Sequence, residues 1–98
     1  MNMQAMLQQA KKMQKEVTKA QEEINNTTYV GKSSFVSVKV KGTKEVIEVK
    51  INNDSLEGND IEMLEDMIVV ALNDAFSKVD KDVENKLGKY TQGMPGLF

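Results

Sequence analysis

The chain has 98 residues, of which 40% are hydrophobic and 29% are charged, and its formal net charge is −2. These values are typical of one ordinary globular domain and argue against intrinsic disorder. The chain contains neither cysteine nor histidine. This excludes disulfides, thiolate and imidazole metal ligands, and the groups most used for nucleophilic and acid–base catalysis. No segment approaches the roughly 18 apolar residues of a membrane span or the core of a signal peptide. We therefore expect a cytoplasmic protein that is not an enzyme and needs no cofactor, metal or small-molecule substrate.

The net charge conceals two blocks of opposite sign. Residues 1–50 contain nine lysines and five acidic residues, whereas residues 51–98 contain four lysines and ten acidic residues. All thirteen basic residues are lysine. Lysine without arginine favours contact with phosphates over the reading of bases, because the bidentate guanidinium group that recognises guanine is missing.

The first predicted element is a long helix over residues 1–26. Its apolar positions recur at alternating steps of three and four from Met3 to Ile24, the heptad pattern of a helix that packs along a narrow seam. The seam consists mainly of methionine and alanine, which suits a close helix pair. Poor helix formers in the run Asn25–Thr28 end the helix.

A three-stranded antiparallel β-meander is predicted over residues 27–52. Valines and polar residues alternate from Val36 to Lys41, and the alternation resumes with Ile47, Val49 and Ile51 facing the core. Gly42 marks the hairpin between these two strands. The sheet is expected to have one apolar face and one solvent-exposed face.

A second long helix is predicted over residues 59–88, with Asn59 or Asp60 as its N-cap and Gly88 terminating it. Its apolar residues again follow steps of three and four. Residues 89–98 are rich in glycine and contain the one proline, so they are predicted to form a flexible tail.

The helix lengths indicate that the protein is a dimer. At 1.5 Å per residue the two helices are roughly 33 and 40 Å long, whereas a compact domain of this size is about 34 Å across. A sheet of short strands cannot cover both helices, so their apolar stripes need each other or a second chain. The predicted fold is α+β: a long N-terminal helix, a three-stranded antiparallel β-meander and a long C-terminal helix (α-β-β-β-α), dimeric with protruding helices.

The first helix carries a basic face. Lys11, Lys12, Lys15 and Lys19 span an arc of about 100° opposite the apolar seam. Such a face commonly contacts only solvent. The same concentration of positive charge is also typical of surfaces that bind nucleic-acid phosphates. The acidic run Glu62–Asp66 is interpreted as helix-capping charge in preference to a magnesium site.

Four stretches of the sequence form a recognisable combination: "MLQQAKKMQKEVTKAQEEI" in the first helix, "IEMLEDMIVVALNDAF" with Leu64-Glu65-Asp66 and Asn73-Asp74-Ala75, "NNDSL" before it, and the terminal "GMPGLF". In these stretches the chain resembles the YbaB/EbfC family of bacterial nucleoid-associated proteins. The resemblance implies a single domain over 1–98 that forms a homodimer with a shared β core and protruding helices. It also implies binding of double-stranded DNA with little sequence preference and a location at the nucleoid. The DNA-binding residues carried over are Lys11, Lys12, Lys15, Lys19, Lys86 and Lys89.

Two other functions remain open. The first is a helical adaptor or holdase that grips non-native protein chains through apolar helix tips, with Val79, Val83 and Leu87 as open grips. The second is a scaffold whose terminal "PGLF" docks a partner. Salt dependence separates the first from DNA binding, because phosphate contacts weaken steeply with salt and apolar contacts do not.

Overall fold

The computed structural model describes residues 2–52 and 60–91, and these residues follow the order helix, three strands, helix. Helix α1 (Met3–Asn26) leads into strands β1 (Thr28–Ser33), β2 (Val36–Lys41) and β3 (Val46–Ile51), and helix α2 (Ile61–Thr91) follows. The strands form one antiparallel sheet in the order β1-β2-β3. The predicted α-β-β-β-α architecture is confirmed. The predicted connector over 53–59, with Asn59, and the tail from residue 92, with "PGLF", lie outside the described residues.

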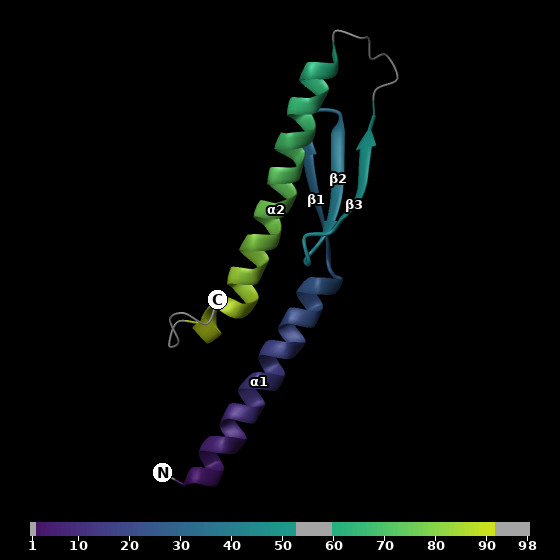
Figure 1. Cartoon of the computed structure of the whole chain (residues 1–98). Helices are drawn as coiled ribbons and strands as arrows, with labels where there is room; N and C mark the ends of the chain where they lie inside the picture. The colour runs from purple at the N-terminus through teal and green to yellow at the C-terminus, as the bar shows by residue number, and fades with distance from the viewer. Residues whose placement is uncertain (1, 53–59, 92–98) are drawn as a thin grey trace.

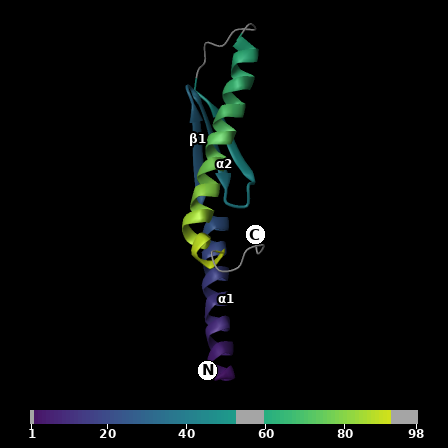
Figure 2. The same cartoon turned by 90° about the vertical axis from the view of Figure 1, so that its left-hand side faces the viewer.

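Helix α2 lies along one face of the sheet, and α1 extends away from the end of the sheet (Figures 1 and 2). The end of α2 lies beside the half of α1 nearest the sheet, and the N-terminal half of α1 continues beyond it (Figure 1). The principal extents are 70 × 22 × 14 Å and the radius of gyration is 19.3 Å, compared with about 13 Å for a compact chain of 100 residues. The helices meet beyond the sheet, as predicted, but only over part of their length.

The core lies between α2 and the first two strands. Every second residue of β2 is buried: Val36, Val38 and Val40. They form one buried cluster with three residues of α2: Ala71, Ala75 and Val79. Gly31 brings the backbone of β1 directly against α2, because a Cβ at this position would lie 2.1 Å from the carbonyl oxygen of Ala71. Small residues at this contact therefore set how closely the helix approaches the sheet.

Strand β3 differs from its prediction. Ile47, Val49 and Ile51 were expected to face the core, yet the apolar side chains of β3 are 39% to 48% exposed. The register pairs Lys39 with Glu48 and Val40 with Val46, so Ile47 is an extra residue in a β-bulge. The exposure has a second cause: α2 packs on β1 and β2, and β3 lies at the edge of the sheet beyond the helix.

Helix α2 ends later than predicted. The sequence placed its end at Gly88, but the helix continues through this residue to Thr91. A glycine inside a helix costs about 1 kcal/mol relative to alanine, and contacts on either side offset that cost. Leu87 is 1% exposed, and the hydroxyl of Tyr90 donates a hydrogen bond to Glu16 of α1 at 3.2 Å. Three residues that were assigned to the flexible tail therefore belong to the helix.

Candidate nucleic-acid interface

Helix α1 forms a polar arm that is anchored at one end. Asn2 caps its start, accepting a hydrogen bond from a backbone N–H of the first turn at 3.0 Å. At the other end the hydroxyl of Thr27 donates to the carbonyl of Glu23 at 2.5 Å, which satisfies one of the carbonyls that a helix end leaves free. Burial along the seam decreases away from the sheet: Ile24 is 0% exposed and Met6 is 53% exposed. The outer half of α1 therefore presents its side chains to solvent.

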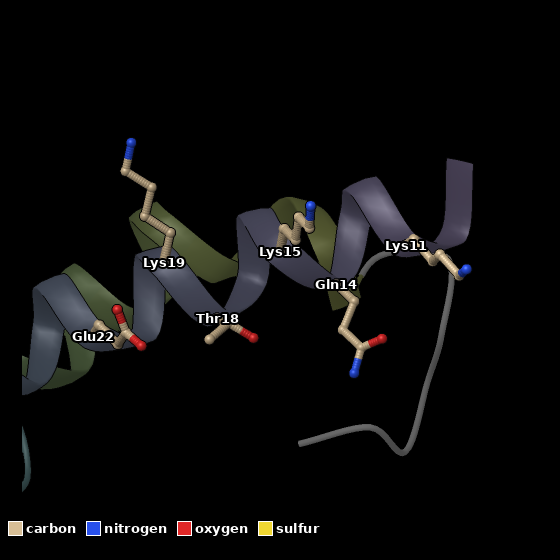
Figure 3. A pocket seen from close by; sticks show the side chains of 6 residues that line it. All are labelled: Lys11, Gln14, Lys15, Thr18, Lys19 and Glu22. Atoms are coloured by element: carbon tan, nitrogen blue, oxygen red, sulfur yellow. The ribbon is translucent and has the colours of Figure 1, made fainter. Parts of the chain in front are cut away.

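Lys11, Lys15 and Lys19 form the lysine stripe of α1. Residues four apart share one face of a helix, and these three lysines line a shallow hollow of about 420 Å³. The other residues of the hollow are Gln14, Thr18 and Glu22. Lys15 and Lys19 extend to one side of α1, whereas Gln14 and Thr18 point to the other (Figure 3). All three lysines are exposed, and no salt bridge ties them to another residue of the described chain.

Lys12 borders the lysine stripe on one side. Residues seven apart differ by only about 20° around a helix, so Lys12 lies next to Lys19 in direction, and it also lines a separate hollow of about 210 Å³ together with Gln9, Met13 and Glu16. The carboxylate of Glu16 accepts the hydrogen bond from Tyr90 of α2. This flank of α1 therefore faces the end of α2, and Lys12 lies between it and the lysine stripe.

Lys86 is held in a network between α2 and the sheet. Its ammonium group pairs with the carboxylate of Asp82 at 3.2 Å, and the same carboxylate accepts a hydrogen bond from the hydroxyl of Tyr29. The hydrogen bond from Tyr29 is the main cause that lowers the pKa of Asp82, and the bond and charge of Lys86 add to it. Burial and the bond to Asp82 raise the pKa of Tyr29 to about 12. The charge of Lys86 is thus partly neutralised, and its side chain is 35% exposed.

Lys89 lies where the two helices meet. Its Nζ atom is 5.0 Å from the ring centroid of Tyr90, a distance at which an ammonium group is attracted to the face of the ring. The same tyrosine reaches Glu16. The six lysines carried over from the family resemblance are therefore divided into the lysine stripe, Lys12 on the flank of α1, and two positions near the end of α2.

A second group of lysines lies on the sheet. Lys39 and Lys41 alternate along β2 with buried valines, and both Lys32 and Lys50 pair with Ser37 across the strands. Residues that are directly paired across strands project from the same face of a sheet. The sequence signal for this group was the period-two alternation, which we interpreted only as a solvent-exposed face.

The exposed apolar residues differ from those expected for a chain-gripping tip. Val79 and Leu87, expected as open grips, are each 1% exposed, and Val83 packs partly buried against the core. That assignment is wrong, because the packing of α2 on the sheet and on α1 uses these positions. The apolar side chains exposed at a helix tip are instead Met3 and Leu7 of α1, at 78% and 58%.

The chemistry of the exposed groups favours a polyanion as ligand. Within residues 2–52 and 60–91, no three acidic side chains come together in a way that could hold a metal ion. In the same part of the chain, no helix is long and apolar enough to cross a membrane. The lysine stripe offers ammonium groups, which donate hydrogen bonds and attract negative charge. Its shallow hollow suits an extended ligand better than a small one that must be enclosed.

Comparison with known proteins agrees with this chemistry. A model of the "YbaB/EbfC DNA-binding family" matches residues 1–94. A nucleoid-associated protein of Lactococcus lactis subsp. cremoris (strain MG1363) is 47% identical, covering 97% of this chain and 98% of the relative. A nucleoid-associated protein of Enterococcus faecalis is 41% identical, covering 98% and 94%. The crystal structure of an uncharacterized protein, HP0035, from Helicobacter pylori matches with a TM-score of 0.74 at 27% identity, covering 92% of this chain and 97% of the other.

Proposed function

Because the chain belongs to the YbaB/EbfC DNA-binding family, we propose that it is a nucleoid-associated protein that binds double-stranded DNA without catalysis and with little dependence on base sequence. The observation that carries this proposal is the lysine stripe, a row of exposed lysines on a protruding helix that form no ion pair with another residue of the described ranges. A location at the cytoplasmic nucleoid follows from the same function.

The stripe recognises the sugar–phosphate backbone. Residues four apart advance about 6 Å along a helix, so Lys11, Lys15 and Lys19 reach successive points along a phosphate strand. Phosphate contacts carry affinity but no sequence information, and the chain has no arginine to read guanine. Lys12, Lys86 and Lys89 add positive charge around the junction of the helices.

The DNA-binding unit is a homodimer. Cross-strand pairing puts Val46, Val49 and Ile51 of β3 on the same face as the buried valines of β2, yet these three residues are 39% to 44% exposed. An apolar strand at the edge of a sheet is a template for association, and proteins normally cover it. A second copy of this chain covers it here.

Helix α2 contributes the other half of this dimer surface. Its Asp74 and Lys78 bond to the backbone of β1, so the opposite flank of the helix is directed toward β3. Helical periodicity places Val69, Leu72 and Phe76 on that flank, and Val69 is 56% exposed. We call these six residues the apolar band: Val46, Val49, Ile51, Val69, Leu72 and Phe76.

The test is fluorescence anisotropy of a labelled DNA duplex of about 30 bp at 50 and 200 mM salt. With four to eight phosphate contacts per dimer, log K falls with log[salt] at a slope of roughly −4 to −7. The variant Lys15→Gln/Lys19→Gln removes up to four contacts per dimer, so it makes the slope shallower by about 2 to 4 and lowers affinity at least about tenfold. The matched control Lys44→Gln/Lys81→Gln removes the same charge away from the stripe and stays within about threefold of wild type.

Two results would contradict the proposal. If the stripe variant binds as wild type does, Lys15 and Lys19 do not form the interface. If wild type binds no duplex at 50 mM salt, the protein does not bind DNA.

A second candidate function is an adaptor that grips protein chains. The exposed tip residues Met3, Met6 and Leu7 favour it. Apolar gripping is insensitive to moderate salt, so protection of an aggregating client protein that is equal at 50 and 200 mM salt supports this function. If Met6→Gln/Leu7→Gln loses this protection and wild type binds no DNA, the adaptor function replaces DNA binding.

A further inference from the structure

The solvent face of the sheet is strongly basic. Lys39 and Lys41 project from β2 on the side opposite the buried valines, and Lys32 and Lys50 lie on the same side by their pairing with Ser37. The three strands contain one acidic residue, Glu48, which is paired with Lys39 at 3.4 Å. In the part of the chain that is described, the other three lysines have no ion-pair partner. We call Lys32, Lys39, Lys41 and Lys50 the sheet lysine face.

This face is hollowed, and most of the polar groups that line it are hydrogen-bond donors. A shallow cavity of about 390 Å³ lies over the end of the sheet near the β1–β2 turn, with Lys32, Lys39 and Lys50 around it. Ser34, Ser37, Asn52, Val36 and Glu48 also line it, and the carboxylate of Glu48 is paired with Lys39. Ammonium, hydroxyl and amide groups in one concave surface are the donors that bind phosphate oxygens in protein–DNA contacts.

The spacing of the lysines suits a nucleic-acid strand. Lys39 and Lys41 are two residues apart on one strand of the sheet, which is about 6.6 Å. Two steps along one DNA strand advance about 6.8 Å along the duplex axis. The exposed acidic residues of α2, such as Glu62 and Asp66, lie in the other layer of the molecule, so the sheet side is the one that attracts a polyanion.

The sheet lysine face is separate from the lysine stripe. Between Lys15 and Lys32 the chain advances along about half of α1 and then along β1, about 30 Å in total at the rises of a helix and a strand. Lys19 and Lys41 are nearer to each other, because Lys41 pairs with Thr28 just after α1, and the same rises give about 15 Å between them. Both separations exceed the Debye length of about 8 Å at physiological salt, so salt largely screens the charges of one patch from those of the other. The apolar band faces the opposite side of the sheet, and a second copy docked there leaves the sheet lysine face open.

We propose that the solvent face of the sheet binds the phosphate backbone of a second DNA segment, so that the protein bridges two duplexes. This inference rests on the proposed function, because it takes DNA binding by the lysine stripe as given. The lysine stripe holds one duplex, and Lys32, Lys39, Lys41 and Lys50 hold the other.

The experiment is a two-duplex capture assay with the full chain. A biotinylated duplex is immobilised on beads and saturated with protein, and retention of a second, fluorescent duplex is measured at 100 mM salt. The test variant is Lys32→Gln/Lys50→Gln, and Lys44→Gln/Lys81→Gln is the matched control with the same charge loss elsewhere. Single-duplex affinity is measured by anisotropy for each protein, and folding is checked by thermal unfolding.

We expect wild type and the control to retain the second duplex. The sheet variant, Lys32→Gln/Lys50→Gln, should retain at least about tenfold less of the second duplex, while the affinity of this variant for a single duplex stays within about threefold of wild type. That combination can arise only if the sheet lysine face serves a second segment.

Four results overturn the inference, and they are distinguishable. If the sheet variant retains the second duplex as wild type does, or if wild type binds one duplex but retains no second, bridging by the sheet is wrong and the proposed function stands. If the sheet variant loses single-duplex affinity as the stripe variant does, the two patches form one site for one duplex. If wild type binds no DNA at all, the proposed function and this inference fail together.

Discussion

Tyr29, Asp82 and Lys86 join β1 to the distal half of α2 through side-chain atoms. Tyr29 is 9% exposed, and its hydroxyl donates to a carboxylate that also pairs with Lys86. The contact ties two residues that are 53 positions apart. It therefore fixes where α2 sits along the sheet, at the point where α2 leaves the sheet for α1.

This contact predicts a specific pH dependence of stability. The pKa of Tyr29 is raised from 10.0 to about 12, so between these values the folded chain keeps a proton that the unfolded chain loses. Stability is therefore fully present below pH 10 and falls as pH rises toward 12, by about 2–3 kcal/mol. The pKa of Asp82 is lowered from 3.8, so its contribution is present above that pH and is lost as pH falls through the lower folded value.

The variant Tyr29→Phe tests the assignment. At pH 7 it should lower the free energy of unfolding by about 1–3 kcal/mol, because it removes a hydrogen bond to a charged group. It should also remove most of the decline between pH 10 and 12. Urea unfolding of both proteins at pH 7, 9 and 11 measures the two effects. Equal alkaline losses in wild type and variant would assign the decline to other groups.

The side chains of the candidate interface could be predicted from the sequence only where a local period governs them. A spacing of four residues put Lys11, Lys15 and Lys19 together, and alternation put Lys39 and Lys41 on the outer face of the sheet. Asp82 is four residues before Lys86, a local spacing, but its hydrogen bond from Tyr29 could not be predicted, because Tyr29 is distant in sequence and carries no local signal. The position of Lys12 beside the stripe also follows from the helical period, but the helical wheel does not show which flank of α1 the end of α2 occupies.

At the scale of elements, α1 changes character along its length. Ile24 is fully buried at the sheet, and its main-chain atoms lie against the turn after β2, where a Cβ on Gly42 would come within 2.0 Å of the Ile24 carbonyl oxygen. Met3, Met6 and Leu7 are 53% to 78% exposed. Helix α1 is therefore packed against the rest of the chain at its C-terminal end and exposed at its N-terminal end.

Substitutions along α1 should reflect this gradient. Ile24→Ala removes a buried side chain and should lower the free energy of unfolding by about 2–5 kcal/mol. Met6→Gln/Leu7→Gln changes exposed positions and should stay within about 0.5 kcal/mol of wild type, with DNA affinity unchanged. Urea unfolding measures the free energy of unfolding of each variant, and anisotropy of a labelled duplex measures its affinity for DNA. A loss above about 1 kcal/mol in the second variant would show that the tip of α1 is packed in the dimer.

Most elements could be predicted from the sequence, because their hydrophobic periods are regular. The helical steps of three and four and the alternation in β2 are undisturbed, and the structure has these elements where they were expected. The bulge at Ile47 was not predictable, since register depends on the partner strand. Nor was the continuation of α2 past Gly88, because the contacts that hold the last turn come from α1 and not from α2 itself.

At the scale of the whole molecule, three surfaces point in different directions. The lysine stripe lies on the protruding helix, the sheet lysine face lies on the outside of the sheet, and the apolar band lies on one flank of α2 and on the inner face of β3. This separation lets a second copy bury the apolar band without covering either basic surface. A dimer then presents two copies of each basic surface, and linked contacts strengthen one another without any new interaction.

Val49→Asp tests whether the apolar band joins two copies. Val49 is 44% exposed in a single chain, so a carboxylate there remains hydrated in the monomer, whereas in the dimer it would be buried without a partner at a cost of several kcal/mol. We expect light scattering after size exclusion to give the 11.0 kDa mass of one chain for this variant and twice that mass for wild type. Thr43→Asp, in the exposed β2–β3 turn, adds the same charge and should remain dimeric.

The same variant shows whether dimerisation supports DNA binding. A monomer carries one lysine stripe, so its slope of log K against log[salt] should be about half that of the dimer, and its affinity at least tenfold lower. A dimeric Val49→Asp would exclude the apolar band as the interface. A monomer that binds with the wild-type slope would mean that one arm makes all the phosphate contacts, so the second copy would serve only to cover β3.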